Sequence, residues 1–129
     1  MVRYLLAAAI GILLSTQAYS HHSFSTIYFD DRSVTIEGEL VQFLYRNPHS
    51  FIYLVVNERG QEVRYAIEWR GAGRLGEQGV TQQSLKVGDR IIISGNPGRN
   101  ATDHRLRLNS LVRPRDGFQW KQSTYETIQ

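Results

Sequence analysis

The amino-acid sequence predicts an all-β domain with little helix. In five segments between residues 33 and 112, apolar and polar residues alternate with the two-residue period of half-buried strands. Gly38 interrupts the first and longest segment, as in a strand that bends around a barrel. The one segment with helical potential falls between the third and fourth strands. This order predicts a five-stranded barrel like the oligonucleotide/oligosaccharide-binding (OB) fold; a small β-sandwich is the alternative.

The five predicted strands are separated by turns or by one short helical piece. The first ends in the turn Arg46–Ser50, because asparagine and proline favour turns and proline lacks the donor that a ladder needs. Residues 71–79 hold too many glycines for a long helix, so we expect one or two turns there. Pro114 ends the last strand and precedes a polar tail. The predicted strands cover residues 33–45, 51–56, 62–69, 90–94 and 105–112.

The first twenty residues have the features of an export signal. Arg3 is basic, residues 4–14 are apolar, and Ala18-Tyr19-Ser20 places small residues where a signal peptidase needs them. We therefore expect cleavage after Ser20, with cleavage after Ala18 as the alternative. The apolar run is shorter than the ~20 residues of a spanning helix, so no transmembrane anchor is expected after cleavage. These features predict a periplasmic protein.

The expected mature chain contains about 109 residues, enough for a single domain. We divide it into an extended arm over residues 21–32, a barrel over residues 33–114 and the polar tail over residues 115–129. The sequence contains no cysteine, so burial rather than disulfides must stabilise the fold. The net charge of the full chain is +3, which is too small to indicate a nucleic-acid partner.

Two adjacent histidines, His21 and His22, follow the expected cleavage site. With His21 first, its terminal amine and ring nitrogen can chelate one metal ion, and His22 or His49 can add a further nitrogen. Such nitrogen-rich, tetragonal coordination favours copper(II). Asp30 and Glu68 are candidates for an oxygen ligand or for a carboxylate that orients a histidine ring.

The alternative cleavage after Ala18 also predicts copper binding. It would make His21 the third residue, so that the amine, two backbone amides and the imidazole could form a square-planar site. In either case protons compete with the metal, because histidine and the terminal amine titrate near ~6.5 and ~7.7–8.0 respectively. Copper affinity is therefore expected to fall on acidification.

Several motifs together resemble those of the exported bacterial family DUF6152. The most specific are His21-His22-Ser23-Phe24 and Asn47-Pro48-His49, because their order and separation are unusual in combination. The resemblance implies a compact periplasmic β-domain, and the family carries no established activity. Residues 70–74 depart from the small, proline-containing segment expected there. The other matching positions are Phe29-Asp30, Val34-x-Ile36-x-Gly38, Glu68 and Leu85-Lys86-x-Gly88-Asp89.

A second hypothesis places an anionic or sugar-like ligand on the outer face of the barrel. OB-like barrels bind across their second and third strands, where Phe51 and Tyr53 would lie with Arg105 and Arg107 nearby. A third hypothesis is a module that binds an envelope protein. The sequence has no cysteine nucleophile, phosphate-binding glycine loop or zinc-protease motif, so we expect a non-enzymatic protein whose one candidate cofactor is copper(II).

Barrel geometry limits how the histidines can meet. The start of the first strand and the loop with His104 should share one end, while His49 lies at the other. An extended arm of eleven residues can reach ~36 Å, so it is long enough to join the two ends.

Overall fold

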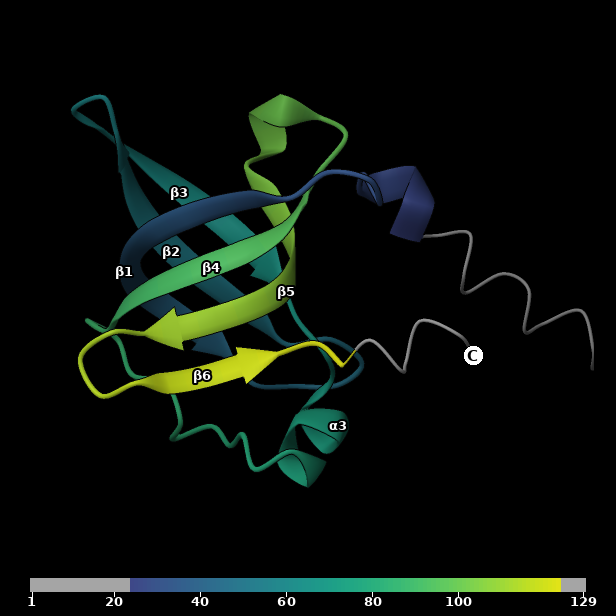
Figure 1. The fold of residues 1–129 in the computed structure, drawn as a ribbon, viewed down its shortest axis with the longest axis vertical. Helices are drawn as coiled ribbons and strands as arrows, with labels where there is room; N and C mark the ends of the chain where they lie inside the picture. Colours follow the sequence, from purple (N-terminus) through teal and green to yellow (C-terminus); the bar gives the residue numbers. More distant parts are fainter. Residues whose placement is uncertain (1–23, 124–129) are drawn as a thin grey trace, which may run out of the picture.

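Six strands form one sheet, and the first five close into a barrel. The computed structural model describes residues 24–123. The strand order is β3-β2-β1-β4-β5-β6, and a parallel pairing of β3 with β5 closes the barrel (Figure 1). The strands are β1 (Val34–Leu44), β2 (Phe51–Glu58), β3 (Gln61–Glu68), β4 (Arg90–Pro97), β5 (Arg105–Arg113) and β6 (Phe118–Lys121).

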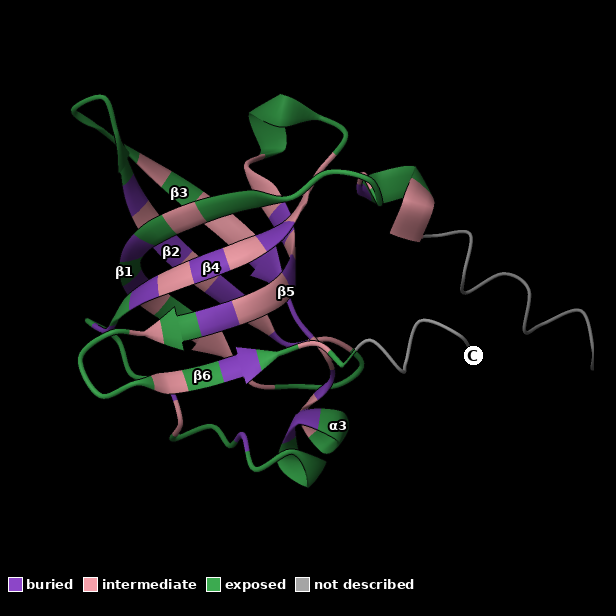
Figure 2. Ribbon diagram, viewed as in Figure 1, coloured by how far each residue is buried: buried purple, intermediate pink, exposed green. Residues whose placement is uncertain are grey.

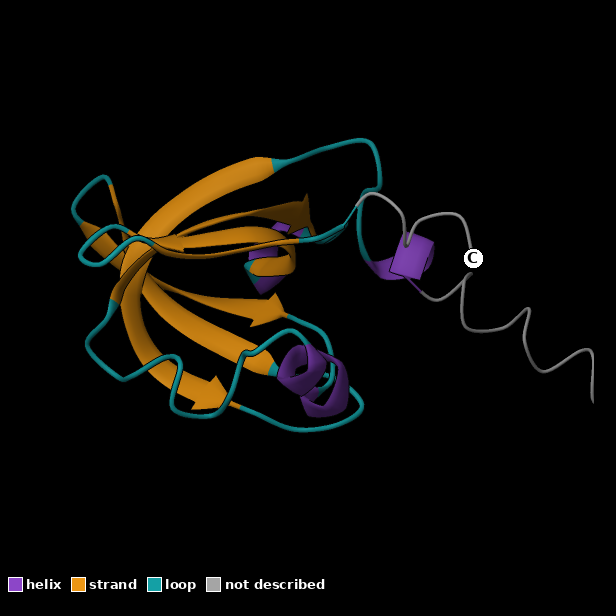
Figure 3. Cartoon of the chain, turned by 60° about the horizontal axis from the view of Figure 1, so that its bottom comes forward, coloured by secondary structure: helices purple, strands orange, loops and turns teal. Residues whose placement is uncertain are grey.

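The predicted OB-like barrel is confirmed. All five expected strands are present, and the six-residue helix α3 (Ala72–Glu77) falls between β3 and β4. Figure 3 shows the strands curled around the barrel, with α3 beside one end. The β3–β5 pairing joins what would be two separate sheets, so the sandwich alternative is wrong. A 3₁₀ turn, η1 (Ala101–Asp103), lies in the β4–β5 loop.

Two segments differ from the sequence-based expectation. The expected polar tail contains β6, which pairs antiparallel with β5 and buries Trp120. The arm was expected to be extended, but residues 24–27 form a helical turn. Tyr28 then makes an isolated bridge to Gly98, just after β4. The arm therefore belongs to the folded domain rather than leading into it. No helix within residues 24–123 is long and apolar enough to cross a membrane.

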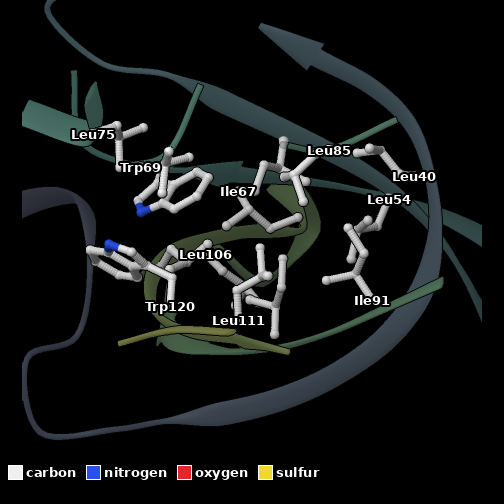
Figure 4. Close-up of a cluster of buried hydrophobic side chains, with 14 of the residues drawn as sticks. Leu40, Leu54, Ile67, Trp69, Leu75, Leu85, Ile91, Leu106, Leu111 and Trp120 are labelled. Atoms are coloured by element: carbon white, nitrogen blue, oxygen red, sulfur yellow. The ribbon is translucent and has the colours of Figure 1, made fainter. Parts of the chain in front are cut away.

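The core fills the barrel from end to end. Figure 2 shows buried residues alternating with exposed or intermediate ones along the strands, as expected for a barrel that faces water outside. In Figure 4, Leu75, Trp69 and Trp120 lie together at one end of the core, while Leu40 and Ile91 lie at the other. The two tryptophan rings meet edge to face, with centroids 5.2 Å apart. The core thus ends in an aromatic cluster beneath α3.

Gly38 allows β1 to curve tightly against β2. A Cβ atom at this position would lie 2.5 Å from the backbone oxygen of Val55. Real Cβ atoms do not approach so closely, so a side chain here would force the two strands apart. The interruption that suggested a bent strand in the sequence therefore has a steric cause.

Candidate functional site

The turn between β1 and β2 is held in place by the start of α3. The backbone oxygen of Arg46 accepts a hydrogen bond from Ala72 N (3.0 Å), and Asn47 Oδ1 accepts one from Gly73 N (3.1 Å). Asn47 thus caps the helix from another part of the chain, because the first amides of a helix lack partners within it. The Asn47–Pro48 peptide bond is cis. Fixing this turn also fixes the position of His49.

His49 makes an ion pair or hydrogen bond with Glu68 at the end of β3. Its Nδ1 lies 2.5 Å from Glu68 Oε1. The Glu68 side chain is buried, since the residue is only 8% exposed. The hydroxyl of Tyr28 donates to Glu68 Oε2 at 2.5 Å, and Arg105 Nη2 lies 3.6 Å from the same oxygen. Both oxygens of this buried carboxylate are therefore occupied, as burial of a charge requires.

The arm lies across the ends of β3 and β5 and covers Glu68. The ring of Phe24 contacts His49, with centroids 5.4 Å apart, and the guanidinium of Arg107 lies 4.6 Å from the Phe24 centroid. Tyr28 is fully buried. Burial and the adjacent Glu68 carboxylate raise the pKa of Tyr28, so its hydroxyl keeps its proton and remains a donor. Phe24 and Tyr28 thus dock the arm onto the His49–Glu68 pair.

We expect Tyr28→Phe to release the arm and to lower the free energy of unfolding by about 1.5–3 kcal/mol, the usual range for a hydrogen bond to a charged group. Amide hydrogen exchange in residues 24–32 and urea unfolding would measure the two effects. Tyr65→Phe is the matched control, because the Tyr65 hydroxyl donates to Glu58, whose bond is exposed to solvent. Equal losses in both variants would show that Tyr28 does not anchor the arm.

A cavity of about 360 Å³ opens beside this pair. The arm contributes Phe24, the turn contributes Pro48 and His49, and the end of β3 contributes Glu68 and Trp69. Its other walls include Arg70, Gly71, Arg74, Arg107, Leu108 and Gln122. Arg70 and Arg74 were not among the residues expected at a site. The signal in the sequence is that one arginine comes just before α3 and the other lies within it.

The candidate metal ligands are only partly within the described residues. His21 and His22 lie outside them, so their predicted role is untested. The structure brings His49 and Glu68 together, whereas Asp30 is exposed and lies outside the walls of the cavity. Within residues 24–123, no three or more His, Cys, Asp or Glu side chains are grouped to hold a metal ion.

The alternative ligand face has the expected arrangement of strands. The register places Phe51, Glu68 and Arg107 in one row across β2, β3 and β5, and Tyr53, Ala66 and Arg105 in the next. Phe51 and Tyr53 stack on each other with centroids 6.4 Å apart. Arg64 covers Tyr53 and Arg46 covers Phe51 by cation–π contacts. The four predicted residues thus share one face, and the arm occupies part of it at Arg105 and Arg107.

His104 and His49 contact different residues. It occupies the left-handed backbone region, with φ of 45°, and its ring packs edge-on against Tyr65 at 5.2 Å. Its backbone oxygen accepts a hydrogen bond from Ala66 N. His104 therefore serves as a matched control for experiments on His49.

These features define a class of protein: a small closed β-barrel whose N-terminal arm docks beside a histidine–glutamate pair and a cavity lined by arginines. The chain belongs to a family of unknown function, DUF6152, whose sequence profile matches residues 10–107. The resemblance seen in the sequence is thereby confirmed. No curated protein matches the chain.

Proposed function

We propose that this protein is a non-enzymatic periplasmic copper-binding protein. The terminal amine and ring of His21, the ring of His22 and the ring of His49 supply the nitrogen ligands. Contact between Phe24 and His49 carries the proposal, because Ser23 alone separates Phe24 from His22. This short separation along the chain supports His49 as the third proposed ligand residue.

The hydrogen bonding of His49 supports a role as a ligand. Its Nδ1 faces the buried carboxylate of Glu68, so a neutral ring with its proton on Nδ1 has the lone pair of Nε2 available for a metal. Histidines that bind metals commonly donate their other nitrogen to a carboxylate, which fixes the ring and makes it more basic. Glu68 is therefore proposed as the residue that orients His49. Tyr28 holds Glu68 in turn.

Chain length is compatible with a joined site, in which His21, His22 and His49 bind one metal ion. An extended chain spans at most ~3.6 Å per residue, so the Cα atoms of His21 and Phe24 are no more than ~11 Å apart. Phe24 itself packs on His49. The arm therefore needs no movement across the barrel to bring the predicted ligands to His49.

The test is a copper(II) titration of protein exported to the periplasm, with the first residue established by intact mass. We expect one equivalent of copper(II), a nitrogen-rich electron paramagnetic resonance spectrum, and affinity lowered at least about tenfold by His49→Ala or Glu68→Gln. His104→Ala should bind like the wild type. Unchanged tight binding by His21→Ala would contradict the assigned terminal ligand, and unchanged binding by His49→Ala would contradict the joined site.

A further inference from the structure

The arm takes up only part of the outer barrel face. It contacts Arg105 through Tyr28 and Arg107 through Phe24, and these are the two arginines that the sequence places beside an external ligand. The half-buried rings on the neighbouring strand β2 lie on the same face. A ligand that binds at these rings therefore needs cations other than the two that the arm already contacts.

Two different arginines flank the rings of β2. The guanidinium of Arg46 lies 5.3 Å from the Phe51 centroid, and the guanidinium of Arg64 lies 4.7 Å from the Tyr53 centroid. The two ring centroids are 6.4 Å apart. These contacts join Arg46, Phe51, Tyr53 and Arg64 in series, and we call this row of side chains the outer ladder. Its members come from the turn after β1, from β2 and from β3.

The two arginines of the outer ladder keep an uncompensated positive charge at the surface. Both Arg46 and Arg64 are exposed, and neither forms an ion pair with a carboxylate of residues 24–123. Their partners are neutral: the two rings and, for Arg64 Nη2, the side-chain oxygen of Gln42 at 3.0 Å. A guanidinium has five N–H donors in its plane, so contact with a ring face and one hydrogen bond leave donors for a ligand.

The chemistry of the outer ladder favours an acidic glycan over a peptide or a nucleic acid. Strand β2 pairs with β1 on one side and with β3 on the other, so it has no free edge for an extended peptide. Single-stranded nucleic acids bind largely by stacking bases on aromatic rings. Here each ring already contacts a guanidinium, so the face offers charge and N–H donors more than open rings. Carboxylates are well suited to these donors, because they accept paired hydrogen bonds from a guanidinium.

We propose that the outer ladder binds an acidic glycan, in which carboxylates on separate sugar units are held by Arg46 and Arg64. Phe51 and Tyr53 act by holding the two guanidiniums in place. OB-like barrels bind oligosaccharides across these strands, which supports the location. None of the proposed copper ligands belongs to the ladder, so the site goes beyond copper binding and does not depend on it.

The test is isothermal titration calorimetry of metal-free mature protein with hexagalacturonate, an acidic hexasaccharide, at low ionic strength. Maltohexaose is the neutral control of equal length, while hexaglutamate and a single-stranded DNA hexanucleotide carry their charge on other kinds of chain. We expect saturable binding of hexagalacturonate, weakened by salt, and no binding of maltohexaose. Absence of hexagalacturonate binding would overturn the site, and equal or tighter binding of the peptide or the DNA would overturn the glycan class.

Variants separate the ladder from a general attraction of charge. Arg46→Gln and Arg64→Gln should each lower the affinity for hexagalacturonate about tenfold or more. Tyr53→Leu should lower it about threefold, because this variant removes the ring that supports Arg64 and leaves the charge unchanged. The control Arg90→Gln removes one positive charge on β4, where Arg90 pairs with Glu37, and should bind like the wild type. Equal losses in Arg90→Gln and Arg64→Gln would contradict the assigned site, and copper titrations of all these variants should match the wild type.

Discussion

Gly71→Ala is expected to destabilise the protein by about 3 kcal/mol and to weaken copper binding, because it displaces the turn that holds His49. A Cβ atom at position 71 would lie 2.5 Å from the backbone oxygen of Pro48 and 2.6 Å from Asn47 Oδ1. The backbone conformation of Gly71 is open to alanine, with φ of −63°, so the effect is steric. Urea unfolding and a copper(II) titration of the same preparation would measure both changes.

Gly73→Ala, two residues further along and inside α3, is the matched control. The nearest atom to its added Cβ would be Asn47 Oδ1 at 3.8 Å, an ordinary contact distance. Alanine favours helix over glycine by up to about 1 kcal/mol, so this variant should be as stable as the wild type or more stable. It should also bind copper normally. Similar losses in the two variants would show that α3 tolerates no side chain there, and would contradict the specific role of the Gly71–Pro48 contact.

The barrel was predictable because its strands bury one face each. Burial on one side imposes a two-residue period, and that period is visible in the sequence of β1 to β5. In β6 the same period is present but short, with Phe118 and Trp120 alternating with Gln119 and Lys121. Because β6 follows Pro114, it was assigned to the polar tail from the sequence. Pairing with β5 supplies the stability that four residues lack on their own.

The site was predictable only in part, since its geometry depends on contacts between distant segments. His49 and Glu68 were both singled out as candidates, yet their contact depends on the β2–β3 register and on burial by the arm. Tyr28 was missed because a tyrosine in a segment without periodicity gives no local sign that its hydroxyl meets a carboxylate 40 positions away. The helical turn at residues 24–27 was missed for a related reason, since docking stabilises it.

Removing the charge of Asp89 is expected to have the second large effect on stability. Asp89 is 6% exposed, and its Oδ2 accepts hydrogen bonds from Arg113 Nη1 at 2.6 Å and from Lys86 N at 2.9 Å. Asp89→Asn removes this buried countercharge and leaves Arg113 paired with the exposed Asp116. We therefore expect the free energy of unfolding to fall by about 2–3 kcal/mol near neutral pH. Glu37→Gln is the control, because the exposed Arg90–Glu37 pair has nearly the same length, 2.7 Å. The free energy of unfolding should fall by less than about 1 kcal/mol in Glu37→Gln.

The pH dependence of this effect distinguishes lost charge from lost packing. Burial opposes ionisation of Asp89, but the hydrogen bonds from Lys86 and Arg113 outweigh it, so its pKa is lowered below the ordinary 3.8. A carboxylate with a depressed folded-state pKa contributes stability above its unfolded pKa and loses it as the pH falls through the folded pKa. The difference between wild type and Asp89→Asn should therefore be constant above about pH 5 and shrink below about pH 4. Urea unfolding of both proteins across this pH range measures the difference. At low pH the aspartic acid is protonated, so both side chains are neutral. A stability difference that persists there would therefore come from packing and not from charge.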